Sequence, residues 1–284
     1  MPIDPEVAVG ADLGKTEFAW SSTDVLLYHL ALGAGGHPTE ESELRYVLED
    51  RLQVLPTFGV VAPNFRMFEP PAVTFPGVDV DLSKVLHGTQ EITVHRQLPT
   101  SGRAVASSRI ADVWDKGKAA VIVQEAEVTD LAGTPLWTTR SGIFARGEGN
   151  FGGNRGPALR LPPPHGAPKL EIEVPTLPQQ ALLYRLCGDR NPLHADPAFA
   201  VTAGFDRPIL HGLCSYGFTG RALLQTFCGN DSTRFEHIEA RFASPVMPGE
   251  ALTISMWELG TGEAVFTTSV GDRVVIDQGL HKYA

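Results

Sequence analysis

The sequence predicts an α+β fold in which one unit, a helix packed against an antiparallel sheet, occurs twice. Three observations lead to this prediction. A Gly- and Pro-rich segment at residues 151–178 interrupts the chain. Each part begins with a short amphipathic pattern, and each then continues as a series of strand-like runs. Residues 1–150 and 179–284 are therefore expected to form two domains joined by a linker.

The two parts have a similar layout. Residues 24–30 begin the first part and residues 180–186 begin the second, where Thr176 is the expected N-cap and Pro178 lies in the first turn. Turn residues precede the second strand in each part. The expected strands are 88–98, 103–114, 119–129 and 135–146, and then 235–246, 251–258, 263–270 and 273–282.

The parts differ after their first helix. Residues 208–227 contain no proline after Pro208 and are apolar nearly all round, which is typical of a buried helix. The corresponding segment of the first part carries prolines, each of which costs an interior helix position about 3 kcal/mol. These are Pro56, Pro63, Pro70, Pro71 and Pro76. A sheet without its helix leaves room, so we expect an apolar ligand tunnel in the N-terminal half.

Composition excludes several classes of function. Of the 284 residues, 43% are hydrophobic and 20% are charged, as in ordinary globular proteins. The 23 Lys and Arg against 33 Asp and Glu leave a net charge of −10, which argues against a nucleic-acid partner held by bulk positive charge. The longest nearly apolar stretch, residues 25–36, is far shorter than the roughly 20 residues that span a bilayer. No membrane span is expected.

The cysteines and the N-terminus predict a soluble, cytoplasmic protein. Cys187, Cys214 and Cys228 are too few and too scattered for a disulfide framework or a zinc site, which favours a reducing compartment. The N-terminal residues are acidic where a signal peptide needs basic ones.

The densest polar cluster lies at residues 188–197. Gly188 is expected to end the preceding helix, and Pro192 directs Asn191 away from helical angles. The Asp-Pro pair at 196–197 is typical of an N-cap followed by a first-turn proline. The loop is therefore held between two helices, which gives a catalytic loop rigid support.

Two residues of this loop suggest chemistry. Asp189 and His194 are five positions apart, about 140° around a helix, so they converge only in an irregular turn. The structural alternative is strong, because Asp and Asn in turns are usually caps and a His beside Leu193 is usually structural. Metal binding at His194 and Asp196 has little support, since no further spaced ligands occur. No metal site is predicted.

The residues of this region carry a family resemblance. The run 184–197, followed by 203–214, resembles the signature of (R)-specific enoyl-CoA hydratases, the type 2 or MaoC-like hydratases. The likeness extends upstream through Leu-His-Gly at 86–88, Asp-Lys-Gly at 115–117 and Asn-Phe-Gly-Gly at 150–153. The resemblance implies a double hotdog: two antiparallel sheets joined edge to edge, each wrapped round a helix position, with the central helix largely missing in the N-terminal half.

The resemblance also implies the reaction. Water adds reversibly and syn to a trans-2-enoyl-CoA and gives a (3R)-3-hydroxyacyl-CoA, in fatty-acid metabolism such as β-oxidation. No separate cofactor is expected, because coenzyme A is part of the substrate. The partner is thus an acyl-CoA thioester, and relatives suggest a homodimer.

Four residues are assigned to catalysis. Asp189 and His194 can hold one water together, with Asp189 as the favoured base and His194 orienting or returning the proton. Asn191 is expected to position the substrate or the loop. The N–H of Gly212, at the start of the buried helix, suits an oxyanion.

The contacts to substrate and coenzyme rest mostly on the resemblance. Chemically, Lys116 lies at an expected exposed turn where a cation could meet a phosphate. Phe242 would otherwise be a core residue, and His87 a strand-end histidine. The residues assigned to these contacts are His87, Gly88, Lys116, Arg190, Pro192, Leu193 and Phe242.

Three alternatives stay open. A dehydratase of fatty-acid synthesis would run the same chemistry in reverse on carrier-protein or CoA thioesters. A hotdog thioesterase would hydrolyse the thioester, but such enzymes commonly lack the Asp-x-Asn-Pro-x-His loop. A noncatalytic acyl-CoA-binding protein is opposed by the presence of Asp189, Asn191 and His194 together.

Overall fold

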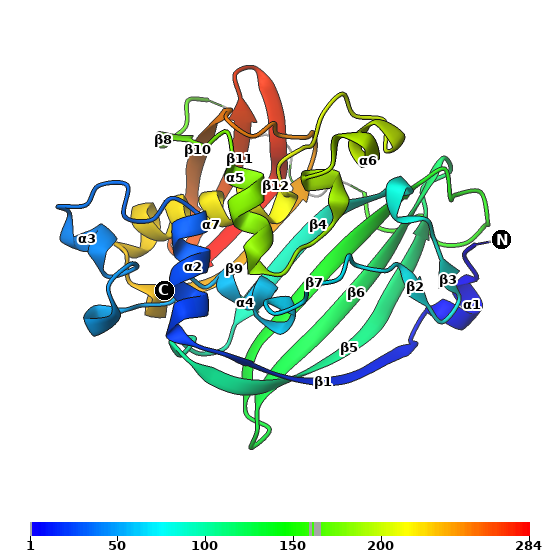
Figure 1. Ribbon diagram of the computed structural model, residues 1–284, viewed down its shortest axis with the longest axis horizontal. Helices are drawn as coiled ribbons and strands as arrows, with labels where there is room; N and C mark the ends of the chain where they lie inside the picture. The colour runs from blue at the N-terminus through cyan, green and yellow to red at the C-terminus, as the bar shows by residue number, and fades with distance from the viewer. Residues whose placement is uncertain (1, 159–160, 162–165) are drawn as a thin grey trace.

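The main chain forms one large antiparallel sheet (Figure 1). A computed structural model describes residues 2–158, 161 and 166–284, so the prolines at 162–164 of the predicted linker lie outside the described residues. Ten strands are hydrogen-bonded in the order β1-β5-β6-β7-β4-β9-β12-β11-β10-β8. They are β1 Asp12–Trp20, β4 Val85–Val94, β5 Gly102–Asp115, β6 Ala119–Asp130, β7 Pro135–Arg146, β8 Leu170–Pro175, β9 Phe235–Phe242, β10 Ala251–Gly260, β11 Glu263–Val270 and β12 Arg273–Tyr283.

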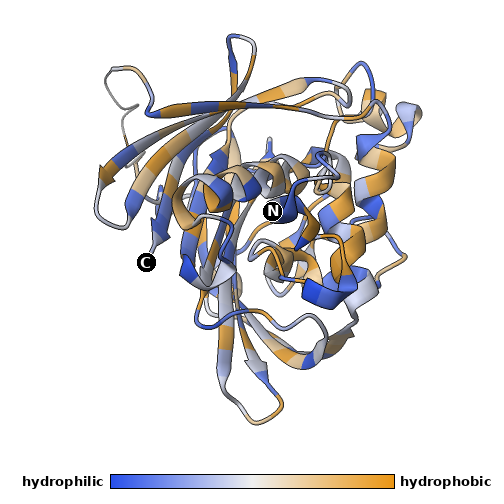
Figure 2. Cartoon of the chain, turned by 90° about the vertical axis from the view of Figure 1, so that its left-hand side faces the viewer, coloured by the Kyte–Doolittle hydropathy of each residue, from blue (hydrophilic) through white to orange (hydrophobic). Residues whose placement is uncertain are grey.

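The two halves join through β4 and β9. These strands pair antiparallel from Thr89 opposite Arg241 to Thr93 opposite His237. The predicted edge-to-edge arrangement of two antiparallel sheets is confirmed. Figure 2 shows hydrophobic and hydrophilic residues alternating along the strands, as expected where one face of a sheet is buried.

Most of the predicted strands match the structure within a few residues, but two strands of the large sheet were not predicted. β1 is an edge strand with mostly exposed residues, and β8 lies inside the predicted linker, where it pairs with β10 as the other edge. β9 also ends at Phe242 rather than at 246, and β4 runs from Val85 to Val94 rather than over 88–98.

The remaining elements are short, except for two helices. The helices and the small hairpin are α1 Pro5–Ala8, α2 Ser22–Ala31, α3 Glu41–Leu44, η1 Glu49–Arg51, α4 Phe58–Val61, η2 Ala62–Asn64, β2 Thr74–Phe75, β3 Val78–Asp79, η3 Leu82–Lys84, α5 Gln180–Tyr184, η4 Arg185–Cys187, η5 Pro192–His194, α6 Pro197–Thr202, α7 Gly212–Cys228 and η6 Ser232–Arg234. No described helix has both the length and the apolar composition needed to cross a membrane.

The expected buried helix is α7, which packs against the C-terminal strands. Two glycines let its neighbours approach closely. A Cβ at Gly217 would lie 2.6 Å from Leu32 Cδ1, and one at Gly220 would lie 2.6 Å from Thr57 Cγ2. Small residues on this helix therefore bring the N-terminal half against it.

One predicted helix start is wrong. α5 begins at Gln180 with Gln179 at the N-cap position, not at Thr176. The Thr176 hydroxyl donates to the Glu250 carbonyl at 2.7 Å and accepts from the Gly249 N–H at 3.0 Å. Thr176 therefore fixes the turn before β10 instead of capping α5.

The N-terminal half lacks a long central helix among the described residues, as the prolines predict. We call the side of β4–β7 that bears Ile92, Val128 and Trp137 the inner face. The short helix α4 packs there, and a Cβ on its Gly59 would lie 2.8 Å from Ile92 Cδ1. The segment around β2 and β3 packs against the far end of the inner face, and the zone between borders a cleft.

Candidate active site

The loop after η4 is placed by a glycine at a close approach of two main-chain segments. Gly188 has φ of +107°, and a Cβ there would lie 2.1 Å from the carbonyl oxygen of Asn64. The predicted helix end at Gly188 is thereby confirmed. The loop touches the N-terminal half at this point, so the next residue, Asp189, lies where the two halves meet.

Asp189 is ionised although it is largely enclosed. Burial raises the pKa of its carboxyl, but His211, His194, the Asn191 N–H and His87 together hold that pKa below the usual value. Its Oδ1 accepts a hydrogen bond from the Asn191 N–H at 3.0 Å. The carboxylate is therefore a hydrogen-bond acceptor at neutral pH.

His194 is neutral and presents one free acceptor nitrogen. Its Nδ1 donates to the Ile209 carbonyl at 2.9 Å, which leaves Nε2 without a proton in the neutral ring. The side chain is buried, and burial lowers its pKa although the charge of Asp189 opposes that shift. Neutral His194 can accept a proton but carries none to give from Nε2.

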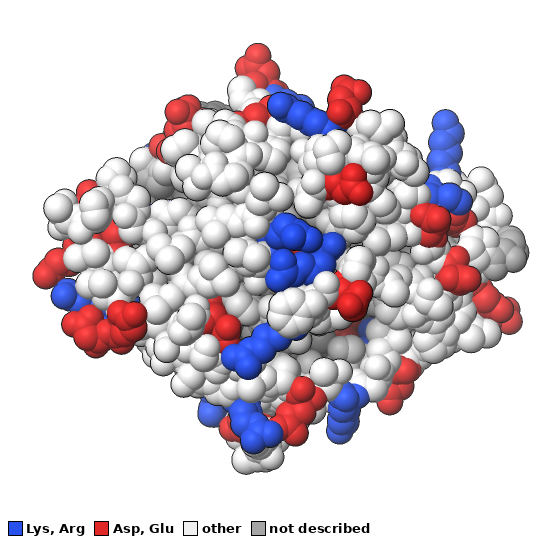
Figure 3. All heavy atoms as spheres, in the orientation of Figure 1, with Lys and Arg blue, Asp and Glu red and all other residues white. Residues whose placement is uncertain are grey.

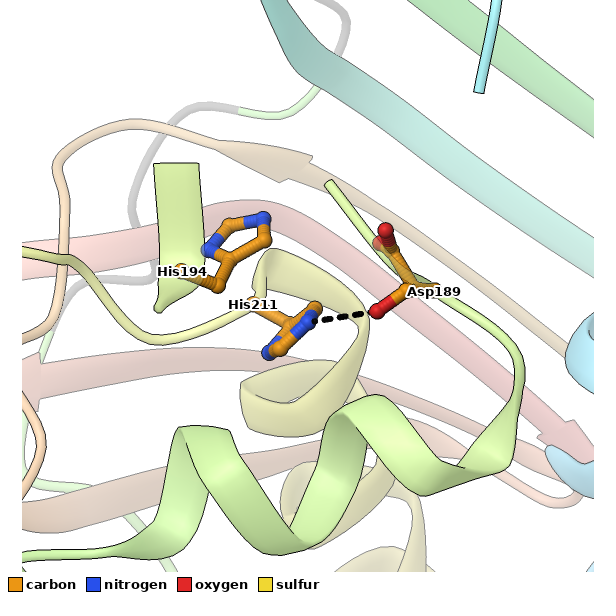
Figure 4. Close-up of side chains that lie close together, drawn as sticks. All are labelled: Asp189, His194 and His211. Carbon is orange, nitrogen blue, oxygen red and sulfur yellow. Dashed lines mark hydrogen bonds between the residues drawn. The ribbon is translucent and has the colours of Figure 1, made fainter. Parts of the chain in front are cut away.

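Asp189 and His194 converge as predicted, and a third residue joins them (Figure 4). A carboxylate oxygen of Asp189 and one ring nitrogen each from His194 and His211 all lie within 4.8 Å of one another. A water molecule about 2.8 Å from each of two acceptors fits that spacing. The irregular turn thus assembles an acceptor pair that helical spacing would have separated.

His211 is the site residue that the sequence reasoning missed. Its Nε2–H donates to the main-chain carbonyl of Asp189 at 3.3 Å, and its ring stacks on His194 with centroids 3.8 Å apart. Burial first, and then the neighbouring His194, lower the pKa of His211 to about 3, so the ring is neutral. The available signal was its place directly before Gly212 in the family-like run.

Asn191 and Gly212 have defined local roles. The Asn191 side chain accepts from the Leu193 N–H at 3.0 Å and caps η5, so it fixes the loop. Gly212 is the first residue of α7, and its N–H has no acceptor among the described residues. A Cβ at Gly212 would lie 3.2 Å from the ring of Phe242, so glycine keeps this entrance open.

His87 and Phe242 face the same space from the β4–β9 junction. Their rings meet edge to face with centroids 5.0 Å apart. The Nε2 of His87 is buried without a hydrogen-bond partner among the described residues. Burial lowers the pKa of His87, and the nearby charge of Asp189 acts in the opposite direction. Gly88 sits in a bulge of β4, where a Cβ would lie 3.1 Å from the Gly142 carbonyl.

One cleft of about 1570 Å³ connects these groups and extends over the N-terminal half. Two predicted contacts, Arg190 and Pro192, do not line it. Arg190 lies over the ring of Phe68 at 5.5 Å. The predicted residues that line the cleft are His87, Gly88, Lys116, Asp189, Asn191, Leu193, His194, Gly212 and Phe242.

Lys116 lies at a turn at the rim, as predicted. Its Nζ donates to the Pro157 carbonyl at 3.3 Å and lies 5.2 Å above the ring of Trp114. Burial, with Arg155 nearby, lowers the pKa of Lys116. Two cations therefore flank this end of the cleft.

Among the described residues, two clusters have the spacing of metal ligands. One is the site itself, Asp189 with His194 and His211, and the other is Glu91 with His237 and Glu239 at the β4–β9 junction. In the first, the Nδ1 of His194 and the Nε2 of His211 already donate to carbonyls. The prediction that no metal is bound is tested by elemental analysis of the purified protein.

Comparison with known proteins gives matches along most of the chain. The family of MaoC like domains matches residues 161–278, and the family of MFE-2 hydratase 2 N-terminal domains matches residues 18–147. Enoyl-CoA hydratase ChsH3 of Mycobacterium tuberculosis is 55% identical over 92% of this chain and 91% of its own.

Solved structures resemble the whole chain. A MaoC-like dehydratase from Phytophthora capsici is 31% identical with a TM-score of 0.85, covering 99% of this chain and 98% of that one. A Mycobacterium tuberculosis protein described as a double hotdog fold, 12% identical with a TM-score of 0.58, covers 99% and 98% and shares the fold alone. The predicted double hotdog is confirmed.

Proposed function

This chain belongs to the family of MaoC-like dehydratases and type 2 enoyl-CoA hydratases, and on that premise we propose that it is an (R)-specific enoyl-CoA hydratase. It would add water reversibly to a trans-2-enoyl-CoA and form a (3R)-3-hydroxyacyl-CoA. The observation that carries the proposal is the convergence of the Asp189 carboxylate and a ring nitrogen of His194 at the wall of a large cleft.

The protonation states determine where the protons come from. Asp189 is ionised and His194 is neutral, so neither has a proton to give before the water arrives. Water therefore supplies both the hydroxyl at C3 and the hydrogen at C2. In the proposed step Asp189 takes one proton as the water oxygen attacks C3, while His194 orients the water.

The Asp189–His194 pair then returns a proton to C2. Because the hydroxyl and the hydrogen leave one water held by one pair of groups, both reach the same face of the double bond. Syn addition follows from this geometry. The reverse reaction removes the C2 proton and expels the C3 hydroxyl as water.

The thioester oxygen needs a donor while it carries negative charge. The free N–H of Gly212 at the start of the 17-residue helix α7 is suited to this task, because unpaired amides and the helix dipole favour an anion. Gly212 lines the cleft, and its lack of a side chain lets a thioester approach the backbone. Asn191 and His211 are proposed to hold the loop that carries Asp189.

The charges at the cleft favour coenzyme A over an acyl carrier protein. Lys116 and Arg155 provide local cations at the rim, where the phosphates of coenzyme A would lie. On the face seen in Figure 3, basic side chains occur in small groups among acidic ones rather than as an extended basic surface. A carrier protein, which is acidic, would require such a surface.

The proposal extends to the cellular setting. The three cysteines are free and buried, which agrees with a reducing compartment and supports a cytoplasmic location. A role in fatty-acid breakdown by β-oxidation is proposed from the family resemblance. A homodimer is proposed from the family resemblance. Cell fractionation tests the location, and light scattering of the purified protein tests the homodimer.

The decisive experiment mixes the purified protein with crotonyl-CoA and with trans-2-decenoyl-CoA. We expect the enoyl-thioester absorbance to fall and chiral analysis to find the (3R)-hydroxyacyl-CoA. Release of free thiol without hydration would make the protein a thioesterase. A (3S) product would contradict the proposed geometry.

A further inference from the structure

The inner face of the N-terminal sheet carries a band of uncharged polar side chains where an apolar tunnel was expected. We call Ser108, Gln124, Thr139 and Ser141 the polar band. Register places them together: Gln124 pairs with Ser141, and Ala126 pairs with both Ser108 and Thr139. All four residues line the cleft that contains Asp189 and His194.

The face on which the band lies follows from its neighbours in sequence. On β6, Ile122 and Val128 are fully buried, so Gln124 between them, at the same parity, points to the inner face. On β7, Trp137 and Ala145 are fully buried, which places Thr139 and Ser141 on that face as well.

The band separates two hydrophobic clusters. One cluster contains Val128 and Trp137 and packs against the helices, and the other contains Ile110 and Ile122 and packs against the segment around β2 and β3. A long central helix would cover this middle zone, but the described chain has none there. The band is thus a part of the inner face that no described helix covers and that borders the cleft.

The polar atoms of the band have no partner in the protein. Among the described residues, no hydrogen bond is made by the side chains of Ser108, Gln124, Thr139 or Ser141. A plain hydrocarbon chain placed against them would displace their water and leave them unpaired, which costs about 1–3 kcal/mol for each group. Such a lining disfavours an unsubstituted alkyl chain.

The distribution of charge indicates which kind of polar group on a ligand the band would bind. The charged side chains of the same strands, Glu125 and Arg140, also border the cleft, but they are paired in an ion-pair network with Asp112 and Arg109. By parity they lie on the outer face, opposite the band. The band itself offers hydroxyl and amide groups, which both donate and accept. It suits a neutral oxygen, such as a hydroxyl or keto group, better than a carboxylate.

We propose that the preferred acyl group carries a hydroxyl or keto oxygen distant from the thioester, and that Gln124 and Ser141 bind this oxygen. The inference rests on the proposed hydratase function and names its substrate class. The other lining of this region includes Val60, Val73 and Phe75, so the oxygen would sit on an otherwise apolar acyl group. Gln124 and Ser141 are specificity residues and take no part in the chemistry.

The test uses matched substrates. The kcat/KM of trans-2-enoyl-CoA thioesters is compared with that of their ω-hydroxy counterparts over a series of chain lengths, which moves the hydroxyl stepwise along the cleft. At the matching length we expect the wild type to favour the hydroxylated thioester by roughly tenfold, the equivalent of one hydrogen bond. A ratio at or below one at every length would overturn the inference.

Two variants assign the preference to the band. In Gln124→Leu/Ser141→Ala the ratio should fall below one, through a higher kcat/KM for the alkyl substrate and a lower one for the hydroxylated substrate. Ser107→Ala, at the neighbouring position on the outer face, is the matched control and should keep the wild-type ratio. An unchanged ratio in the double variant, with an unchanged melting temperature, would also overturn the inference.

A short substrate separates this inference from the proposed function. Crotonyl-CoA carries no distal oxygen, so its hydration reports the proposed function in the wild type and both variants independently of the preference for an oxygenated acyl group. Calorimetric binding of decanoyl-CoA and ω-hydroxydecanoyl-CoA repeats the comparison without any reaction. If crotonyl-CoA is not hydrated, the proposed function fails, and the binding ratio still decides the role of the band.

Discussion

Asp189 is ionised in a pocket formed by three histidines and a main-chain N–H. His194, His211 and His87 each contribute to the lowered pKa of its carboxyl, against the effect of burial. The histidines are themselves held neutral by burial, so the charge of the cluster at neutral pH is that of Asp189 alone. At neutral pH such a cluster can accept a proton from water.

Substitution of either acceptor should remove activity and spare the fold. Asp189→Asn and His194→Ala should each lower kcat on the order of 10²–10⁴-fold, the range for lost acid–base catalysis. Steady-state hydration of crotonyl-CoA measures the loss, and circular dichroism checks the fold. Asp196→Ala is the matched control, because Asp196 only caps α6 and its loss should cost about 1 kcal/mol of stability. Near-wild-type turnover in either site variant would remove the mechanism.

The pH dependence of activity should be flat around neutrality. The pKa of Asp189 lies below its usual value and that of His194 lies below 6.5. At neutral pH Asp189 is therefore already ionised and His194 already neutral, which are the two states that the proposed step requires. We expect kcat/KM to be constant between about pH 7 and 8 and to fall only in acid, below the ordinary histidine range near 6.5. An acid limb centred at or above that range would show that His194 is charged in the free enzyme.

His211 should act through Asp189. His211→Phe keeps an aromatic ring against His194 but loses the hydrogen bond to the Asp189 carbonyl. We expect kcat to fall by about tenfold, the equivalent of one lost hydrogen bond, with KM little changed. His211→Gln, which can donate again, should recover part of the loss. A merely structural role would lower the melting temperature without this recovery of kcat.

At the scale of elements, the loop between η4 and η5 depends on one close approach. Gly188→Ala places a methyl group against the Asn64 carbonyl in addition to a strained φ, so the loop must move and both stability and kcat should fall. Gly204→Ala is the control: its φ is +84°, but its Cβ would meet only the end of Arg146 at 3.8 Å. Gly204→Ala should cost about 1–2 kcal/mol, and Gly188→Ala more, in chemical denaturation. Equal costs would show that the contact with Asn64 is unimportant.

The elements also show what the sequence could predict. The strands β5, β6, β7 and β11 match their predicted ranges closely, because turn residues bound strand-like runs at both ends. The edge strands β1 and β8 are mostly exposed, and β8 lies among the prolines and glycines of the predicted linker, so neither was predicted. The prolines correctly predicted that the described N-terminal half has no long central helix. A proline disrupts a helix at its own position, whatever the rest of the fold does.

Long-range geometry could not be predicted in the same way. The position of His211 depends on how the start of α7 meets the Asp189 loop, two segments that only the fold brings together. The polar band was not predicted. Its recognition requires the strand register, which places Gln124 beside Ser141, together with the finding that no long described helix covers them. The expected tunnel exists as a cleft, but its lining is not uniformly apolar.

At the scale of the whole molecule, buried neutral histidines make stability depend on pH. Burial lowers the pKa of His29 to about 3 and that of His281 to about 4. In the unfolded chain these groups titrate near 6.5, so below that pH the unfolded state binds more protons than the folded state. The free energy of unfolding should therefore fall as pH drops from about 6.5 towards 4.

Urea denaturation over this pH range measures the slope. Each such histidine contributes up to about 1.4 kcal/mol per pH unit. His29→Gln should reduce the slope by about that amount, because His29 bridges the Tyr46 carbonyl and the Leu55 N–H as a neutral ring. His37→Gln removes an exposed imidazole and serves as the control. A slope unaffected by His29→Gln would contradict the assignment.

The junction of β4 with β9 has a consequence for how the protein behaves on dilution. Two separate chains that had to pair through such strands would come apart as their concentration fell. Here both strands belong to one chain, so the effective concentration of one half for the other is set by the connecting segment and stays constant. The cleft between the halves is therefore complete in every single copy, however few copies a cell contains.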